Sequence, residues 1–161
     1  MAHAVFITLH ALAGLIAFGS GVVALRQGRW FYLYLSSLAG MAAFLLLAVA
    51  VTWAELGAEE RLLFAAFVVL AWVMVGLAVG ARRLRPEGSA RPGSTYLDRV
   101  GFTLVALFDA FTVIVVLDVG GQVWLVVASG VVIAVAGHFV LRSTKRTLTS
   151  GARPRAHGQV N

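Results

Sequence analysis

The sequence predicts an all-α membrane protein that crosses the bilayer five times, with its N-terminus outside the cell and its C-terminus in the cytoplasm. Three observations support this fold class. Hydrophobic residues make up 60% of the 161 residues and charged residues only 12%, a balance typical of a chain solvated by lipid. The apolar residues form five runs, each near the roughly 20 residues that a helix needs to cross the hydrocarbon core. The positive charges fall almost entirely in segments that would lie on one side.

Each predicted transmembrane helix is an apolar run between polar segments. The first run lacks a preceding basic segment of the kind that opens a secretory signal, so we expect a retained helix. The second follows a basic turn, the third an acidic segment, the fourth a loop rich in Pro, Gly and Ser at residues 86–95, and the fifth a glycine turn. Residues 1–146 form one predicted transmembrane domain, and residues 147–161 a disordered basic cytoplasmic tail. The predicted helices cover about residues 4–25, 31–53, 62–80, 100–117 and 122–141.

The positive charges give the orientation of the five helices. Lys and Arg total 13. If all five runs span the membrane, Arg61 lies on one side and all the other Lys and Arg residues lie on the opposite side. Cytoplasmic segments carry this excess of positive charge, which places the N-terminus outside and the C-terminus inside. Removing any one helix would scatter the charges over both sides, so the asymmetry also supports the number of helices. The outer side instead collects Glu55, Glu59, Glu60 and Asp118.

Composition excludes several classes of site. The chain has no cysteine, so disulfides, thiolate metal ligands and cysteine nucleophiles are excluded, and we find no metal-binding or catalytic motif. The net charge of +6 is confined to loops and tail, so we expect contacts with anionic lipid headgroups rather than with nucleic acid. Arginine strongly outnumbers lysine, as in bacteria with GC-rich genomes, so the expected location is the bacterial cytoplasmic membrane.

Small residues recur at helical spacing in several predicted helices. In the first helix, His10, Gly14, Ala17 and Gly21 follow one another at steps of four, three and four residues, so they share one face. Small residues let two helix backbones approach closely, which is how helices associate in lipid. We therefore predict packing roles for Gly14, Ala17, Gly21, Gly76, Gly80, Gly130 and Gly137.

Asp109 is the most informative single residue, because it falls near the middle of the predicted span 100–117. An ionised carboxylate facing lipid at that depth would cost several kcal/mol, so the side chain should face the bundle, be protonated or have a partner. Two interpretations stay open. In the functional one, Asp109 binds a proton, an ion or a polar ligand. In the structural one, a hydroxyl such as that of Thr112, Thr103 or Ser129 satisfies the carboxyl group and helix packing is its role.

Two histidines lie inside predicted helices, at different depths. His10 lies towards the outer side and His138 near the inner end of the fifth helix. Two ligands of one haem need similar depth, so a bis-histidine haem is disfavoured and no cofactor is predicted. His10 and Asp109 differ in depth by only about 4 to 6 Å at the rise of a helix. A buried pair in which the carboxylate orients the imidazole is therefore a further hypothesis.

Several short motifs are spread along most of the chain. The first helix contains His10-x-x-x-Gly14-x-x-Ala17-x-x-x-Gly21 and leads into Gly28-Arg29; later, Trp72 precedes Arg82-Arg83, and Leu97-Asp98-Arg99 opens the fourth helix. On these motifs, over about residues 8–117, the chain resembles a family of small bacterial membrane proteins catalogued as a domain of unknown function. Members of that family often carry a histidine just after the basic turn, where this chain has Trp30, Phe31 and Tyr32. The resemblance implies a multi-helix membrane protein and no particular reaction.

Three functions fit these observations. The leading hypothesis is a non-enzymatic structural or accessory membrane component, because the segments outside the apolar runs are too short for a catalytic domain. The alternative is a small proton-linked carrier or polar-ligand binder that uses Asp109 and His10. A third is a haem or quinone protein of a respiratory chain. The expected partners are the lipid bilayer, a second copy of the chain or a larger membrane complex.

Overall fold

The computed structural model describes residues 2–86, 92–118 and 123–150, and over these ranges its regular structure is helical throughout. This confirms the all-α prediction for the described part of the chain, and the five α-helices match the five apolar runs. The elements are α1 (Ala2–Gln27), α2 (Phe31–Thr52), α3 (Ala58–Ala81), the short 3-10 helix η1 (Arg82–Leu84), α4 (Ser94–Asp118) and α5 (Val123–Ser150).

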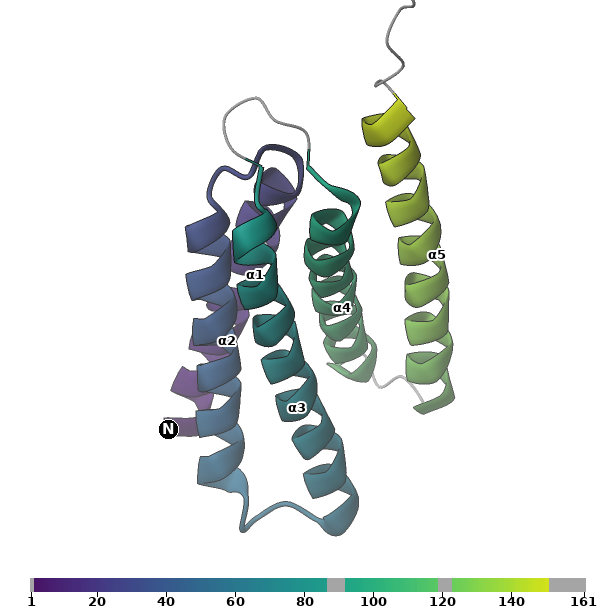
Figure 1. The fold of residues 1–161 in the computed structure, drawn as a ribbon. Coiled ribbons are helices and arrows are strands. Elements are labelled where there is room, and N and C mark those ends of the chain that lie inside the picture. The colour runs from purple at the N-terminus through teal and green to yellow at the C-terminus, as the bar shows by residue number, and fades with distance from the viewer. Residues whose placement is uncertain (1, 87–91, 119–122, 151–161) are drawn as a thin grey trace, which may run out of the picture.

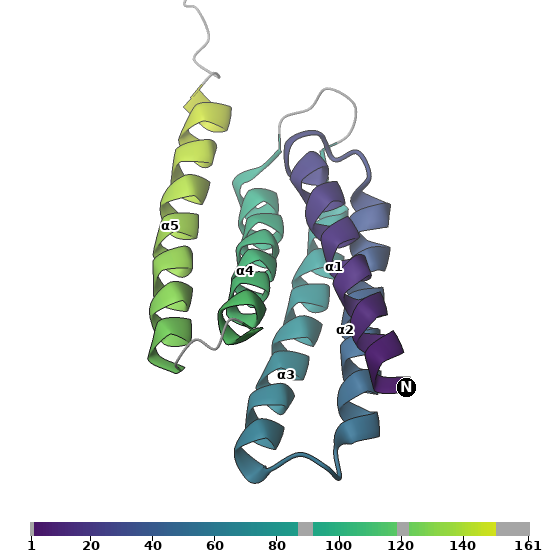
Figure 2. The same cartoon turned by 180° about the vertical axis from the view of Figure 1, so that it is seen from behind.

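The five α-helices lie side by side, and each runs antiparallel to the one before it in the chain (Figure 1). The α1–α2 turn, η1 and the C-terminal end of α5 lie at one end of the bundle, and the α2–α3 connection lies at the other. The helices α1 to α4 share a core, whereas α5 packs mainly against α4 at the edge (Figure 2). Arg29 of the α1–α2 turn and Glu55 of the α2–α3 connection are thus at opposite ends.

Three helical segments are long and apolar enough to cross a membrane: His3–Gln27, Phe31–Thr52 and Ala58–Leu84. Large apolar side chains on these helices point outward, among them Leu15, Leu62 and Val69, which are 59%, 75% and 63% exposed. An outer surface of this kind is typical of a bundle that lipid surrounds. The structure therefore supports a membrane protein. For α5, the described apolar stretch is the shorter segment Gly130–Ser143.

Some helices extend beyond the apolar runs. α3 begins at Ala58 and α4 at Ser94, ahead of the predicted starts at residues 62 and 100. α5 continues to Ser150, so residues 147–150 are helical, contrary to the predicted disordered tail, and residues 151–161 lie outside the described part. An apolar run marks only the stretch that lipid can surround, whereas helical hydrogen bonding continues into water through good helix formers such as Leu, Lys and Arg.

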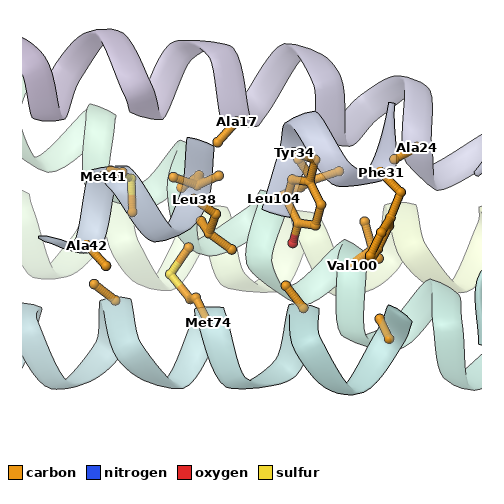
Figure 3. Close-up of a cluster of buried hydrophobic side chains, with 14 of the residues drawn as sticks. Ala17, Ala24, Phe31, Tyr34, Leu38, Met41, Ala42, Met74, Val100 and Leu104 are labelled. Atoms are coloured by element: carbon orange, nitrogen blue, oxygen red, sulfur yellow. The ribbon is translucent and has the colours of Figure 1, made fainter. Parts of the chain in front are cut away.

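The core is made by small residues of α1 facing large residues of α2. These side chains lie between the helices in Figure 3, with further members from α3 and α4. Small side chains let the two backbones approach closely, and the larger ones fill the remaining space. The residues that are wholly buried there include Ala17 and Ala24 on α1 and Tyr34 and Leu38 on α2.

The predicted stripe on α1 is the side that packs against α2 and α4. A Cβ atom added to Gly14 would lie 3.1 Å from Phe111 Cζ of α4 and 3.4 Å from Met41 Sδ of α2. Ala17 is wholly buried, and Gly21 is likewise flanked by side chains of both helices. The absence of larger side chains on this stripe is what admits the aromatic and sulfur-containing groups of the neighbours.

The two glycines of α3 do not follow the same pattern. No atom of another element lies within 4 Å of a Cβ placed on Gly76, so Gly76 packs against no helix in the described ranges. Gly80 leaves room for the guanidinium group of Arg99 from α4 rather than for a helix backbone. Spacing alone could not predict this difference, because lipid-facing and helix-facing sides of a membrane helix are both apolar.

Candidate functional site

The seam between α4 and α5 is closely packed. A Cβ atom on Gly137 would lie 2.6 Å from both Cγ atoms of Val105, and one on Gly101 would overlap the side chain of Leu141. Gly101, Val105 and Asp109 follow at steps of four, so they share the face of α4 that meets α5. Gly101 carries no sequence signal, because no other small residue of α4 lies three or four positions from it.

Asp109 continues this seam and lies against Gly130 of α5. A Cβ atom on Gly130 would be 3.4 Å from Asp109 Oδ1 and 3.6 Å from Oδ2, so the carboxyl group borders on the space left by the missing side chain. Oδ1 is buried and has no hydrogen-bond partner among the described residues. Leaving a buried polar atom unsatisfied costs on the order of 1–3 kcal/mol, so such atoms are uncommon in folded proteins.

The threonine hydroxyls predicted as partners of Asp109 donate elsewhere. Thr112 and Thr103 donate to backbone carbonyls of the preceding turn of α4, at 3.0 and 2.8 Å. The side chain of Ser129 lies outside the described residues. Neither threonine therefore supports the structural interpretation of Asp109, in which a hydroxyl satisfies the carboxyl group.

His10 faces α2 rather than Asp109. Its Nδ1 lies 2.9 Å from the carbonyl oxygen of Met41, and because a carbonyl only accepts, Nδ1 is the donor. Phe111 lies beside Gly14 and so marks the side of α4 that meets α1. Asp109, two residues earlier, is about 200° away around the helix. The structure does not bring His10 and Asp109 together. They lie at similar depth, but His10 faces α2 and Asp109 lies on the side of α4 that faces away from α1.

His3 approaches α2 in the same way, with Nδ1 3.5 Å from the carbonyl oxygen of Ala48. His3 and His10 are seven residues apart on one face of α1, so they are too far apart along the helix to share one ligand atom. The side chain of His138 lies outside the described residues. Over the residues that were placed, no group of three or more His, Asp or Glu side chains could hold a metal ion.

Buried hydrogen bonds also join α4 to α1 and α2 in the core. The hydroxyl of Tyr34 in α2 is hydrogen-bonded to the hydroxyl of Thr103 in α4, and Tyr96 Oη donates to the carbonyl oxygen of Ala24 in α1 at 2.7 Å. All three side chains are buried. Tyr96 precedes the predicted span 100–117, and burial raises the pKa of its hydroxyl, so it remains a donor. The sequence carries no signal for this cluster, because each residue alone is an ordinary interfacial or packing residue.

Comparisons with known proteins found no family model, no curated protein and no solved structure that matches this chain. The resemblance to a family of small bacterial membrane proteins therefore stays a prediction. Among the residues predicted as sites, Asp109 is the one whose surroundings are unusual, since its buried oxygen has no partner in the described part of the chain.

Proposed function

We propose that this protein is a five-pass protein of the bacterial cytoplasmic membrane in which Asp109 binds a proton or a polar ligand between α4 and α5. The buried oxygen of Asp109 that no described residue satisfies carries this proposal. A carboxylate without a partner in an apolar seam is costly, and either protonation or a bound polar group relieves that cost. The protein would thus act as a small proton-linked carrier or polar-ligand binder.

The packing around Asp109 supports this role over a purely structural one. A structural aspartate would be held by hydroxyl donors, yet Thr103 and Thr112 donate to backbone carbonyls instead. Gly130 has no side chain to crowd the two carboxyl oxygens, which favours a proton or one small polar group beside them. His10 has no part in this proposal, because its ring is directed at α2.

The five-pass topology is tested by reporters of sidedness. We propose that the arginine-rich end of the bundle, with the α1–α2 turn and η1, lies in the cytoplasm. A reporter active only in the cytoplasm should then work when fused after residue 161 and fail when fused before residue 1. A periplasmic reporter should give the opposite pattern. Activity of one reporter at both ends would contradict an odd number of crossings.

Replacing Asp109 by asparagine should abolish modification by dicyclohexylcarbodiimide, a reagent that attacks protonated carboxyl groups in apolar surroundings. Mass spectrometry of the purified wild type should locate the adduct on Asp109, and its yield should fall as pH rises because the carboxylate does not react. In liposomes containing a pH indicator, the same variant should lower proton flux to the protein-free level. Asp98→Asn is the matched control, because it removes an exposed carboxyl group from the same helix and should leave both results unchanged.

Two results would contradict the proposal in different ways. An unmodified Asp109 in the wild type at every pH would show that its carboxyl group takes no proton in the accessible range. If Asp109 is modified but proton flux is equal in wild type and Asp109→Asn, Asp109 binds a proton and the protein is not a proton carrier.

A second candidate function, an accessory component of a larger membrane complex, is favoured by the position of α5. This helix packs mainly against α4 and exposes Val131, Val132, Val135 and Val140 by half or more. A helix of another subunit or of a second copy would fit such a face. Co-purification of a stoichiometric membrane partner, lost when Val132 and Val135 are changed to leucine or alanine, would support the accessory role, and a monodisperse monomer in mild detergent would argue against it.

A further inference from the structure

Two arginines share one aromatic ring at the end of the bundle where α2 begins and α3 ends. The guanidinium Cζ of Arg82 lies 5.5 Å from the ring centroid of Tyr32, and that of Arg85 lies 5.0 Å from it. Arg82 is in η1, Arg85 is the residue directly after η1, and Tyr32 is in the first turn of α2. Residues more than forty positions apart in sequence thus converge on one surface patch, the Tyr32 patch.

The ring of Tyr32 is itself held in place by the core. Phe31, which is 1% exposed, meets Tyr32 edge to face with the ring centroids 6.2 Å apart. Phe31 also contacts the ring of the buried Tyr96 at 6.0 Å. Tyr32 is therefore a supported platform at the surface, and the two arginines lie on a site that exists before any ligand arrives.

The two guanidinium groups bring two positive charges together over one ring. Each guanidinium group is attracted by the negative face of the Tyr32 ring. Stacked guanidinium groups keep their N–H edges for a planar or tetrahedral anion, and arginine recognises phosphate in this way. The arrangement therefore has the chemistry of a phosphate-binding site with two cationic sides.

The surroundings of the Tyr32 patch fit a lipid better than a soluble phosphate. Leu84 lies between the two arginines in sequence and is 42% exposed, and Trp30, at the start of α2, is 58% exposed. Apolar and aromatic side chains next to arginines at the end of apolar helices are typical of the headgroup level of a bilayer. Leu84 and Trp30 can contact acyl chains while the guanidinium groups contact the phosphate.

We propose that Arg82 and Arg85, stacked on Tyr32, bind the phosphate of an anionic phospholipid. This site is separate from Asp109 and does not depend on the proposed function. Its lipid would lie in the cytoplasmic leaflet if the proposed orientation holds, but the binding site itself is the same in either orientation.

The test is lipid binding to the full-length protein purified in a neutral detergent. Native mass spectrometry follows the titration with phosphatidylglycerol, and phosphatidylcholine serves as the lipid without net charge. The double variant Arg82→Gln with Arg85→Gln should lower the apparent affinity for phosphatidylglycerol about 10-fold or more. Tyr32→Leu, which leaves every charge in place, should also weaken binding, because the platform is lost.

The matched control is Arg26→Gln with Arg83→Gln. It removes the same number of positive charges from exposed arginines near the same end of the bundle, whereas the described cation–π contacts of Tyr32 are those with Arg82 and Arg85. Its affinity should fall by no more than about 2- to 3-fold, the part due to general electrostatic attraction. Circular dichroism and elution volume confirm that each variant is folded before its affinity is compared.

Three outcomes would overturn the proposal. Equal losses in the two double variants would mean that the arginines act only as diffuse charge. Unchanged affinity in Tyr32→Leu would remove the stacked platform. Displacement of phosphatidylglycerol by millimolar inorganic phosphate would assign the site to a soluble anion rather than to a lipid.

Discussion

Replacing Gly21 by valine is expected to destabilise the bundle by about 2–3 kcal/mol, because no space remains for a side chain where α1 meets α2 and α4. A Cβ atom there would lie 2.8 Å from Leu104 Cδ2 and 3.0 Å from Tyr34 Cδ2. The end of the leucine side chain can shift, but the tyrosine ring cannot do so cheaply. Its hydroxyl is hydrogen-bonded to Thr103, so moving the ring would leave a buried hydroxyl without its partner.

The measurement is thermal unfolding of the purified protein in detergent, and Gly19→Val is the matched control. Gly19 lies on the same helix two residues earlier, and no described atom of another element is within 4 Å of its added Cβ. Both variants place a β-branched residue in a helix, so the difference between them isolates the packing effect. Gly19→Val should change the melting temperature little. Equal losses in the two variants would mean that Gly21 matters for helix propensity and not for packing.

Replacing Gly28 by alanine is the second large expected effect, a destabilisation of about 2–4 kcal/mol. Gly28 has a φ of +64°, a left-handed conformation that costs a residue with a Cβ atom about 1–2 kcal/mol. The added Cβ would also lie 2.5 Å from the carbonyl oxygen of Pro86. A backbone atom cannot change rotamer, so the α1–α2 turn and the segment after η1 would have to separate.

Thermal unfolding also tests this prediction, with Gly93→Ala as control. Gly93 lies in the same α3–α4 connection as Pro86, and it has no positive φ and no described atom within 4 Å of an added Cβ. Gly28→Asn distinguishes the two causes, because asparagine tolerates the left-handed region but keeps the overlap with Pro86. If Gly28→Asn is as stable as the wild type, backbone conformation alone explains the loss. If Gly28→Ala is also unchanged, the contact with Pro86 does not stabilise the fold.

No residue of the candidate site around Asp109 could be placed completely from the sequence. The depth of Asp109 follows from counting along an apolar run, but its neighbour Gly130 and its unsatisfied oxygen follow from how α4 meets α5. His10 illustrates the same limit, because a depth was predictable and its contact with the carbonyl of Met41 was not. The Tyr32 patch joins residues from α2 and from the segment after α3, and no local pattern connects them.

The sequence by itself determined that the chain is helical, where its five apolar runs lie and that its positive charges collect at one end. Those properties depend on bilayer thickness and on local charge, which act along the chain. Only the tertiary structure decided which faces pack: Gly14 and Gly21 meet neighbouring helices, whereas Gly76 meets none in the described part of the chain. The physical reason is that lipid and a neighbouring helix are both apolar solvents for a side chain, so hydrophobic periodicity cannot tell them apart. Polar contacts and close approaches of small residues, which depend on the partner helix, make that distinction.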